Sequence, residues 1–225
     1  MRKKRPLDRE AKFVRDASLV VIASEDRYAV RQYFDFFEST RIQFRVLETP
    51  DGKSAPEHVL ERISEYLKNF EIGEGDTFWI VCDCDHWVEP NHIQNLTHVL
   101  RECRKKRVKV ALSNPCFDLW LLLHFADFPA ENMLTCAEVA DRLHTAVRGY
   151  DKTKVYNLPI DNEKVSDAVK RAGDTYQPRM KIPRQLQTAV HLIIRSLIRG
   201  RIISVRRTRE KAAGTGKKKP KGAKN

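Results

Sequence analysis

Apolar runs and helical patterns alternate along the first two thirds of the chain. Four short apolar stretches, at 18–23, 42–48, 77–82 and 107–112, have the length and the valine and isoleucine content of buried strands. The segments between them carry apolar residues at helical spacing. Strands that alternate with helices in this way predict an α/β domain with a mainly parallel sheet flanked by helices.

Residue types typical of helix starts mark two of these helices. Ser54 and Glu57 have the spacing of a capping box, in which the two side chains close the first helical turn. Asn114 followed by Pro115 predicts an N-cap and a proline in the first turn of another helix. That helix, 115–125, is almost wholly apolar, so we expect it to be deeply buried.

The strand signal fades after about residue 130, and helical patterns replace it. Thr135 and Glu138 form a second capping box. Residues 161–172 and 183–199 also have helical spacing, which predicts a helical C-terminal half packed on the sheet and no second sheet domain. The chain is therefore divided into a basic N-terminal arm (1–16), an α/β core (17–130), a helical region (131–205) and a disordered basic tail (206–225).

The net charge of +12 is concentrated at the two ends of the chain. Residues 1–12 carry a net charge of +4 and residues 201–225 one of +9, which leaves residues 13–200 near −1. Basic arms of this kind suit salt-sensitive contacts with phosphates, and a tail that only improves solubility is the alternative. The candidate nucleic-acid contacts in the tail are Arg206, Arg207, Lys217, Lys218 and Lys219.

The cysteines and the hydropathy suggest where the protein works. Five cysteines, none in a C-x-x-C pair, lead us to expect reduced thiols and argue against a thiolate metal site. No apolar run approaches the roughly 18 residues that cross a bilayer, and no apolar core follows the basic start as in a signal peptide. We expect a cytoplasmic protein that does not bind membranes.

Polar side chains gather where the predicted strands end. Glu25 and Asp26 follow the first strand, Asp83 and Asp85 the third, and Asn114 the fourth. The carboxyl ends of parallel strands meet at one edge of a sheet, where ligands commonly bind. Residues two apart on a strand share a face, so the two aspartates of the D-x-D pair point to one side and the cysteines beside them to the other.

Converging carboxylates repel one another unless a cation neutralises them, and Mg²⁺ or Mn²⁺ is the natural occupant of such an oxygen-rich site. Such an ion stabilises the charge that develops in phosphoryl transfer, and a nearby carboxylate acts as general acid or base. His86, directly after the D-x-D pair, would assist. The alternative is that the pair only forms a turn or caps a helix.

The arrangement of Glu25 and a later D-x-D pair resembles the Toprim domain of topoisomerases, primases and OLD-type nucleases. More specifically, the chain resembles the RloB-like family of restriction and abortive-infection loci over about residues 18–200. The resemblance rests on SNPCFDLWLLLHF (113–125), DGKSAPEHVL (51–60), GYDKTK (149–154) and QYFDFF (32–37).

This resemblance implies a Toprim-class nuclease that hydrolyses nucleic-acid phosphodiesters in defence against phage. Asp83 and Asp85 would hold Mg²⁺ or Mn²⁺, and Glu25 would be the acid or base or a third metal ligand. The resemblance also implies a partner ATPase, because the chain has no phosphate-binding loop of its own. The choice of DNA or RNA, tRNA included, and a homo-oligomeric state are left open. The alternative function is a catalytically degenerate subunit that binds nucleic acid as a sensor or scaffold.

Other residues near these stretches have two interpretations each. Asp26 stands where the family has glycine, and it would either adopt a left-handed conformation or add a carboxylate to the site. Asn114 would cap the following helix or also face the site. Asp118 is an acid on an apolar helix and needs a partner. Lys152 is the candidate phosphate-binding cation, with a surface lysine as the alternative, and His124 is expected to be a core histidine.

Overall fold

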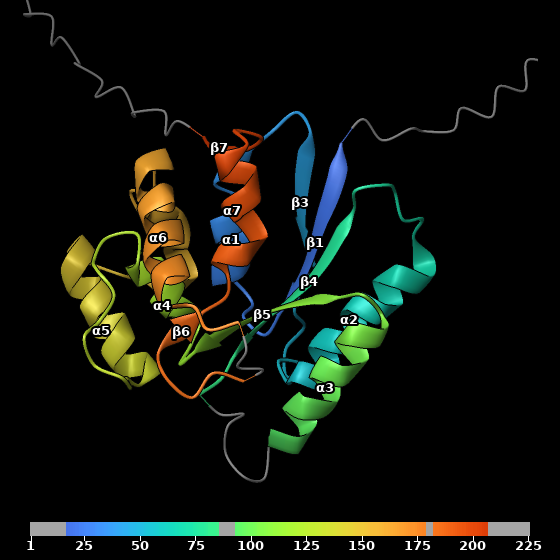
Figure 1. Ribbon diagram of the computed structural model, residues 1–225, viewed down its shortest axis with the longest axis horizontal. Coiled ribbons are helices and arrows are strands. Elements are labelled where there is room, and N and C mark those ends of the chain that lie inside the picture. The colour runs from blue at the N-terminus through green and yellow to red at the C-terminus, as the bar shows by residue number, and fades with distance from the viewer. Residues whose placement is uncertain (1–16, 86–92, 179–181, 207–225) are drawn as a thin grey trace, which may run out of the picture.

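Five strands form the central sheet of the computed structural model, which describes residues 17–85, 93–178 and 182–206 (Figure 1). Their order across the sheet is β3-β1-β4-β5-β6, and all pairs are parallel except β5 with β6. The strands are β1 (Ser18–Ser24), β3 (Ile42–Val46), β4 (Thr77–Asp83), β5 (Lys109–Asn114) and β6 (Gln187–Thr188). The predicted α/β class and its four parallel strands are thus confirmed.

Helices cover both faces of the sheet, and alternate residues of each strand face them (Figure 1). On one face, Leu19 and Val21 pack beneath α2 (Pro56–Asn69) and α3 (Ile93–Lys105). On the other face, Val20 belongs to the larger core. The helices on that side are α1 (Ala29–Phe34), α4 (Phe117–Leu122), α5 (Cys136–Val147), α6 (Asn162–Thr175) and α7 (His191–Arg199).

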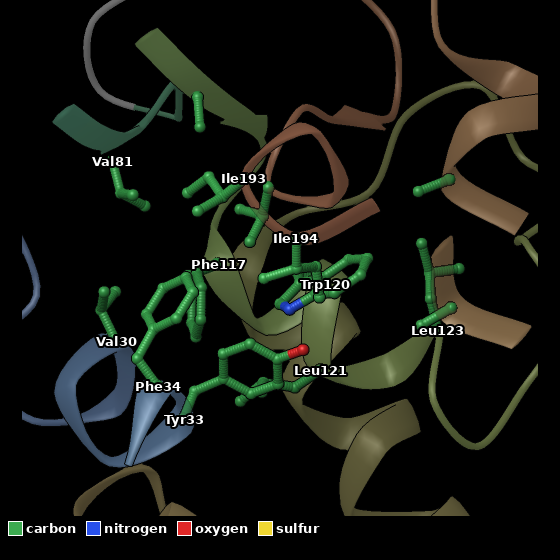
Figure 2. Close-up of a cluster of buried hydrophobic side chains, with 14 of the residues drawn as sticks. Val30, Tyr33, Phe34, Val81, Phe117, Trp120, Leu121, Leu123, Ile193 and Ile194 are labelled. Atoms are coloured by element: carbon green, nitrogen blue, oxygen red, sulfur yellow. The ribbon is translucent and has the colours of Figure 1, made fainter. Parts of the chain in front are cut away.

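Helix α4 lies at the centre of the larger core, as its apolar sequence predicts. All six of its residues are buried. Figure 2 shows Phe117 and Trp120 of this helix gathered with Tyr33 and Phe34 of α1. The Tyr33 ring meets the rings of Phe117 and Trp120 edge to face, at centroid distances of 5.9 Å in both cases. Such pairs add about 0.5–1.5 kcal/mol each to the gain from burial.

His124 is a satisfied core histidine, as expected. Its Nδ1 donates to the Trp120 carbonyl at 2.9 Å, so its Nε2 accepts from the Tyr33 hydroxyl at 3.2 Å. Burial lowers the pKa of His124 to about 4. The imidazole is therefore neutral at physiological pH.

One of the two predicted capping boxes is wrong and the other is confirmed. Helix α2 begins at Pro56 with Ala55 at the N-cap and no side-chain cap, so Ser54 stands one residue too early to close the first turn. At the start of α5, the Thr135 hydroxyl accepts from the Glu138 N–H at 3.2 Å, and the Glu138 carboxylate accepts from the Thr135 N–H at 2.7 Å.

The predicted N-cap role of Asn114 is also wrong. Asn114 is the last residue of β5 and pairs with Gln187 of β6, while α4 starts only at Phe117 with Cys116 as its N-cap. The strand runs on to Asn114 because β6 supplies an antiparallel partner there. The Asn114 side chain instead donates to the carbonyls of residues 183 and 185, at 3.1 Å each.

The predicted helix at 183–199 is shorter than its periodicity suggests. Gln187 and Thr188 form β6, and α7 starts at His191. A second small sheet pairs β2 (Phe37–Glu38) with β7 (Ser204–Val205). No helix in the three described ranges is long and apolar enough to cross a membrane.

The expectation of five reduced thiols is wrong for one pair. Cys116 and Cys136 form a disulfide, with Cα atoms 5.8 Å apart, because the starts of α4 and α5 lie side by side. Cys82, Cys84 and Cys103 are free and buried in the core beneath α2 and α3. The cysteines of the D-x-D stretch therefore face the structural side of β4, as predicted.

Candidate functional site

The carboxylates of three aspartates surround one lysine at the carboxyl ends of the parallel strands. Lys152 Nζ lies 3.2 Å from Asp26 Oδ2. Although partial burial opposes its charge, the carboxylates of Asp118, Asp26 and Asp83 raise the pKa of Lys152. We refer to Asp26, Asp83, Asp85 and Asp118 as the acidic cluster, with Lys152 as its counter-charge.

Asp26 joins the acidic cluster from the loop after β1. Its Oδ1 accepts from the Tyr28 N–H at 2.7 Å and from the Ala29 N–H, so it closes the first turn of α1. Its Oδ2 is left to face Lys152. Asp26 is not among the residues with positive φ. Of its two interpretations, the added carboxylate therefore holds and the left-handed conformation does not.

Asp83 ends β4 and turns toward the start of α4. Its Oδ1 accepts from the Phe117 N–H at 2.9 Å. Burial raises the pKa of Asp83 to about 7, against the opposing effects of Lys152 and the Phe117 N–H. The carboxylates of Asp85 and Asp26 add to the rise. Four carboxyl groups thus share one lysine, so their formal negative charge exceeds its single positive charge.

Asp118 enters the acidic cluster from the first turn of α4 and is only 4% exposed. The partner that this acid was expected to need is the Tyr150 hydroxyl, which donates to Asp118 Oδ1 at 2.7 Å. Burial raises the pKa of Asp118, which Lys152 and Tyr150 oppose. Sequence reasoning missed Tyr150, although it lies two residues before Lys152 in the stretch GYDKTK.

Asp85 lies just beyond β4, beside the start of α5. Its N–H donates to the Pro115 carbonyl at 3.1 Å, and its Oδ2 lies 3.1 Å from Cys136 Sγ. Because the charge of Asp85 helps to raise the pKa of Asp83, the two members of the D-x-D pair are electrostatic neighbours, as their spacing predicts.

Glu25 points away from Lys152. The Glu25 N–H donates to the Val81 carbonyl at 3.3 Å and so extends the β1–β4 ladder by one residue. Alternation along the strand then directs Glu25 to the face of β4 that carries Cys82, whose thiol is hydrogen-bonded to it. Burial and this carboxylate raise the pKa of the Cys82 thiol well above its ordinary value. The structure thus brings Glu25 to Cys82, on the other side of β4 from Asp83.

Arg62 of α2 is a polar residue of this edge that sequence reasoning missed, and no motif marks it. Its guanidinium donates to the Lys53 carbonyl at 2.7 Å and to the Ser24 carbonyl. Burial lowers the pKa of Arg62, whereas Cys82 and Glu25 act in the opposite direction. Arg62 therefore ties the loop after β1 to the start of α2.

The carboxylate oxygens of the acidic cluster suit Mg²⁺ or Mn²⁺. Within the described ranges, no three His, Cys, Asp or Glu side chains stand in a ready metal-binding group. Mg²⁺ commonly binds only one or two protein carboxylates and takes its remaining ligands from water and substrate phosphate. Asp83 and Asp85 fit that requirement, and a cation there would favour the ionised form of Asp83, whose pKa is raised chiefly by burial.

The remaining candidate residues lie elsewhere. Arg206 is exposed, and its N–H donates to the Phe36 carbonyl at 2.8 Å. It follows β7, whose partner β2 precedes the start of β3, so Arg206 lies toward the amino ends of the parallel strands, away from the acidic cluster (Figure 1). Outside the described residues are His86, Arg207, Lys217, Lys218 and Lys219.

Three stretches that are distant in the sequence meet around the acidic cluster. Residues 51–60 approach it through the ion pair of Asp51 with Arg27 in the loop after β1. Residues 113–125 supply Asp118, and residues 149–154 supply Tyr150 and Lys152. These are three of the four stretches on which the family resemblance rests.

Comparison with known proteins identifies the family. The family model described as RloB-like protein matches residues 20–197, well over half of the chain. Neither the curated proteins nor the solved structures gave a match. The matched range includes every member of the acidic cluster as well as Lys152 and Glu25. The chain therefore belongs to the RloB-like protein family.

Proposed function

We propose that this chain is a divalent-metal-dependent nuclease of the Toprim class that hydrolyses nucleic-acid phosphodiesters in defence against phage. The observation that carries the proposal is the acidic cluster, in which four carboxyl groups gather around Lys152 and burial raises the pKa of Asp83 to about 7. An oxygen-rich site with surplus negative charge at the carboxyl ends of parallel strands is suited to a hard cation and, through it, to a phosphate.

Each residue of the site has a definite part in this proposal. Mg²⁺ or Mn²⁺, held by Asp83 and Asp85, would supply electrostatic stabilisation of the phosphoryl oxygens. Lys152 is 45% exposed along its side chain, so its ammonium would also reach a phosphate oxygen while Asp26 and Asp118 hold it in place. The Phe117 N–H fixes the orientation of the Asp83 carboxylate.

The proposal gives Glu25 a supporting part. Its carboxylate lies with Cys82 and Arg62 on the α2 side of β4. Arg62 in turn binds the carbonyl of Ser24. Glu25 would therefore act through Arg62 to hold the loop that carries Asp26 in position.

The second candidate function is a non-catalytic subunit that binds nucleic acid as a sensor or scaffold. It is favoured by the ion pair of Lys152 with Asp26, because the protein then supplies part of the neutralising charge itself. Asp26 also stands where the family has glycine, which lets the backbone turn tightly. In this reading Lys152 binds phosphate and no bond is cleaved.

A cleavage assay separates the two functions. The full chain is incubated with single-stranded DNA, RNA and tRNA in Mg²⁺, Mn²⁺ or EDTA, beside the variant Asp83→Asn/Asp85→Asn. The control Asp141→Asn/Asp174→Asn removes two exposed aspartates distant from the acidic cluster. The nuclease proposal expects cleavage in Mg²⁺ or Mn²⁺ that both EDTA and the cluster variant abolish. Cleavage that survives both would refute the metal-carboxylate mechanism, and binding without any cleavage would favour the second function.

A further inference from the structure

A groove of about 1420 Å³ runs between α3, the start of α5 and the described residues 176–178 and 182–184. Asp85, Asn114 and Cys136 line one end of it, so the groove opens directly onto the acidic cluster. Its volume exceeds the range of roughly 300–1,000 Å³ typical of small-molecule pockets. An extended, chain-like ligand therefore suits it better than a compact one.

Arginines stand on both walls of this groove. Arg101 and Arg104 lie three residues apart on α3, and therefore on one face of the helix, and Arg184 faces them from the other wall. All three are exposed. In the parts of the chain that the structure describes, none of the three forms an ion pair with a carboxylate. Their charges are available for an anionic ligand.

The floor between the arginines is apolar. Leu100, Val108, Val110 and Ile182 line it. A ligand that satisfies both the floor and the walls must carry flat or apolar groups along an anionic backbone. Single-stranded nucleic acid has this character, because its bases are free to lie on an apolar surface while its phosphates meet arginine. In a duplex the bases are stacked and paired inside.

Asn114 holds the wall that carries Arg184. Its side-chain amide donates to the carbonyls of Pro183 and Gln185, on either side of that arginine. Because Asn114 ends β5, these two hydrogen bonds fasten the wall to the edge of the sheet next to Asp83, with which Ser113 pairs. Arg184 is thereby placed at a fixed position relative to the acidic cluster.

We propose that this groove binds single-stranded nucleic acid and guides it to the acidic cluster. Arg101, Arg104 and Arg184 contact the phosphates, and the bases lie on the apolar floor. The proposal rests on the proposed function for what happens at the end of the groove. Binding in the groove itself needs neither metal nor cleavage.

The test is the affinity of the full chain for a short fluorescent single strand, measured by anisotropy in EDTA over a series of salt concentrations. The groove variant is Arg101→Ala/Arg104→Ala/Arg184→Ala. The control, Lys68→Ala/Lys106→Ala/Lys170→Ala, removes the same charge from exposed positions outside the groove. Loss of three phosphate contacts should weaken binding roughly tenfold or more and reduce the salt slope by about 2, since each contact contributes about 0.7 for single strands. The control should change both quantities much less.

Several outcomes are decisive. A groove variant that binds like the control variant would overturn the proposal, and so would an equal loss of affinity for a blunt duplex of the same sequence. Because binding is measured in EDTA, failure here is distinguishable from failure of the nuclease proposal. If the groove variant binds more weakly and the native chain cleaves nothing, the groove proposal stands and the nuclease proposal fails. If the native chain cleaves and the groove variant binds as tightly as the native chain, the nuclease proposal stands and the groove proposal fails.

Discussion

At the scale of single residues, Lys152 has the most neighbours of opposite charge in the candidate site. It sits among Asp118, Asp26 and Asp83, whose carboxylates raise its pKa. Burial nevertheless keeps the pKa values of Asp83 and Asp118 raised, and one lysine faces several carboxyl groups. The lysine and a divalent cation would thus act together on the same excess of negative charge.

Substitution of Lys152 tests this balance. Lys152→Met should lower the free energy of unfolding by about 1 kcal/mol, a small cost because the side chain is partly exposed. Added Mg²⁺ should restore part of the loss by neutralising the same carboxylates. Urea unfolding with and without Mg²⁺ measures both effects, with Lys152→Arg as the charge-conserving control. An unaltered stability in Lys152→Met would argue against a shared counter-charge.

Tyr150 stabilises the acidic cluster through its hydrogen bond to Asp118. Tyr150→Phe removes the donor to Asp118 and leaves a buried carboxylate short of one hydrogen bond, so we expect a loss of about 1–3 kcal/mol in unfolding free energy. Tyr156→Phe is the matched control, because Tyr156 is 57% exposed. Equal stability of the two variants in urea unfolding would show that the hydroxyl of Tyr150 has no structural role.

At the scale of elements, the strands were predictable and the short connections were not. The runs at 18–23 and 77–82 are long enough to show their burial in sequence, and they became β1 and β4. The two-residue strand β6 has no periodicity of its own and exists because β5 offers it an edge. The apolar residues on either side of β6 therefore had helical spacing in the sequence, and a single helix was predicted over 183–199.

The candidate site could be predicted only in part, because some of its contacts depend on the tertiary structure. Asp26 and the Asp83–Asp85 pair were recognised from the ends of predicted strands, and Asp118 was recognised as an acid on an apolar helix. The direction of Glu25 depends on one extra hydrogen bond in the β1–β4 ladder, which is a tertiary contact that the sequence does not reveal. The pairing of Tyr150 with Asp118 depends likewise on how residues 149–154 pack beside α4.

Asn114 at the end of β5 is hydrogen-bonded to residues 183 and 185, and its substitution should make that segment more mobile. Asn114→Ala removes both hydrogen bonds to residues 183 and 185, so we expect faster amide exchange over 183–188 and weaker binding of single strands. Hydrogen exchange with mass-spectrometric readout measures the first effect. Asn95→Ala, on the exposed face of α3, should leave both properties unaltered. Unaltered exchange in Asn114→Ala would contradict the assigned role.

Two buried histidines must stay neutral. His124 follows α4 and His191 opens α7, and burial lowers the pKa of each to about 4. In the unfolded chain each would titrate near its usual pKa of about 6.5. Their contribution to stability is therefore present above that pH and is lost as the pH falls from about 6.5 toward 4, by roughly 3 kcal/mol per histidine at most.

This loss can be measured by urea unfolding at about pH 7 and about pH 5. His124→Phe should reduce the pH dependence of the unfolding free energy, since one buried neutral histidine is gone. His144→Gln, at an exposed position of α5, is the control variant. If His124→Phe retains the full dependence, the neutral state assigned to His124 is wrong.

At the scale of the whole molecule, the charges are divided between the two edges of the sheet. The acidic cluster lies at the carboxyl ends of the parallel strands, and the arginine groove shares Asp85 with it and extends along α3 toward the start of β5. Arg206 lies toward the amino ends. A long nucleic acid would therefore contact the protein at places well apart, with its phosphodiester at the acidic cluster.

We propose that Asp83 and Asp85 form a divalent metal site, and calorimetric titration of Mn²⁺ into the full chain tests this most directly. We expect saturable binding by the native chain and by Asp141→Asn/Asp174→Asn, and its loss in Asp83→Asn/Asp85→Asn. Equal Mn²⁺ binding by the native chain and the cluster variant, or no saturable binding by the native chain, would contradict the claim.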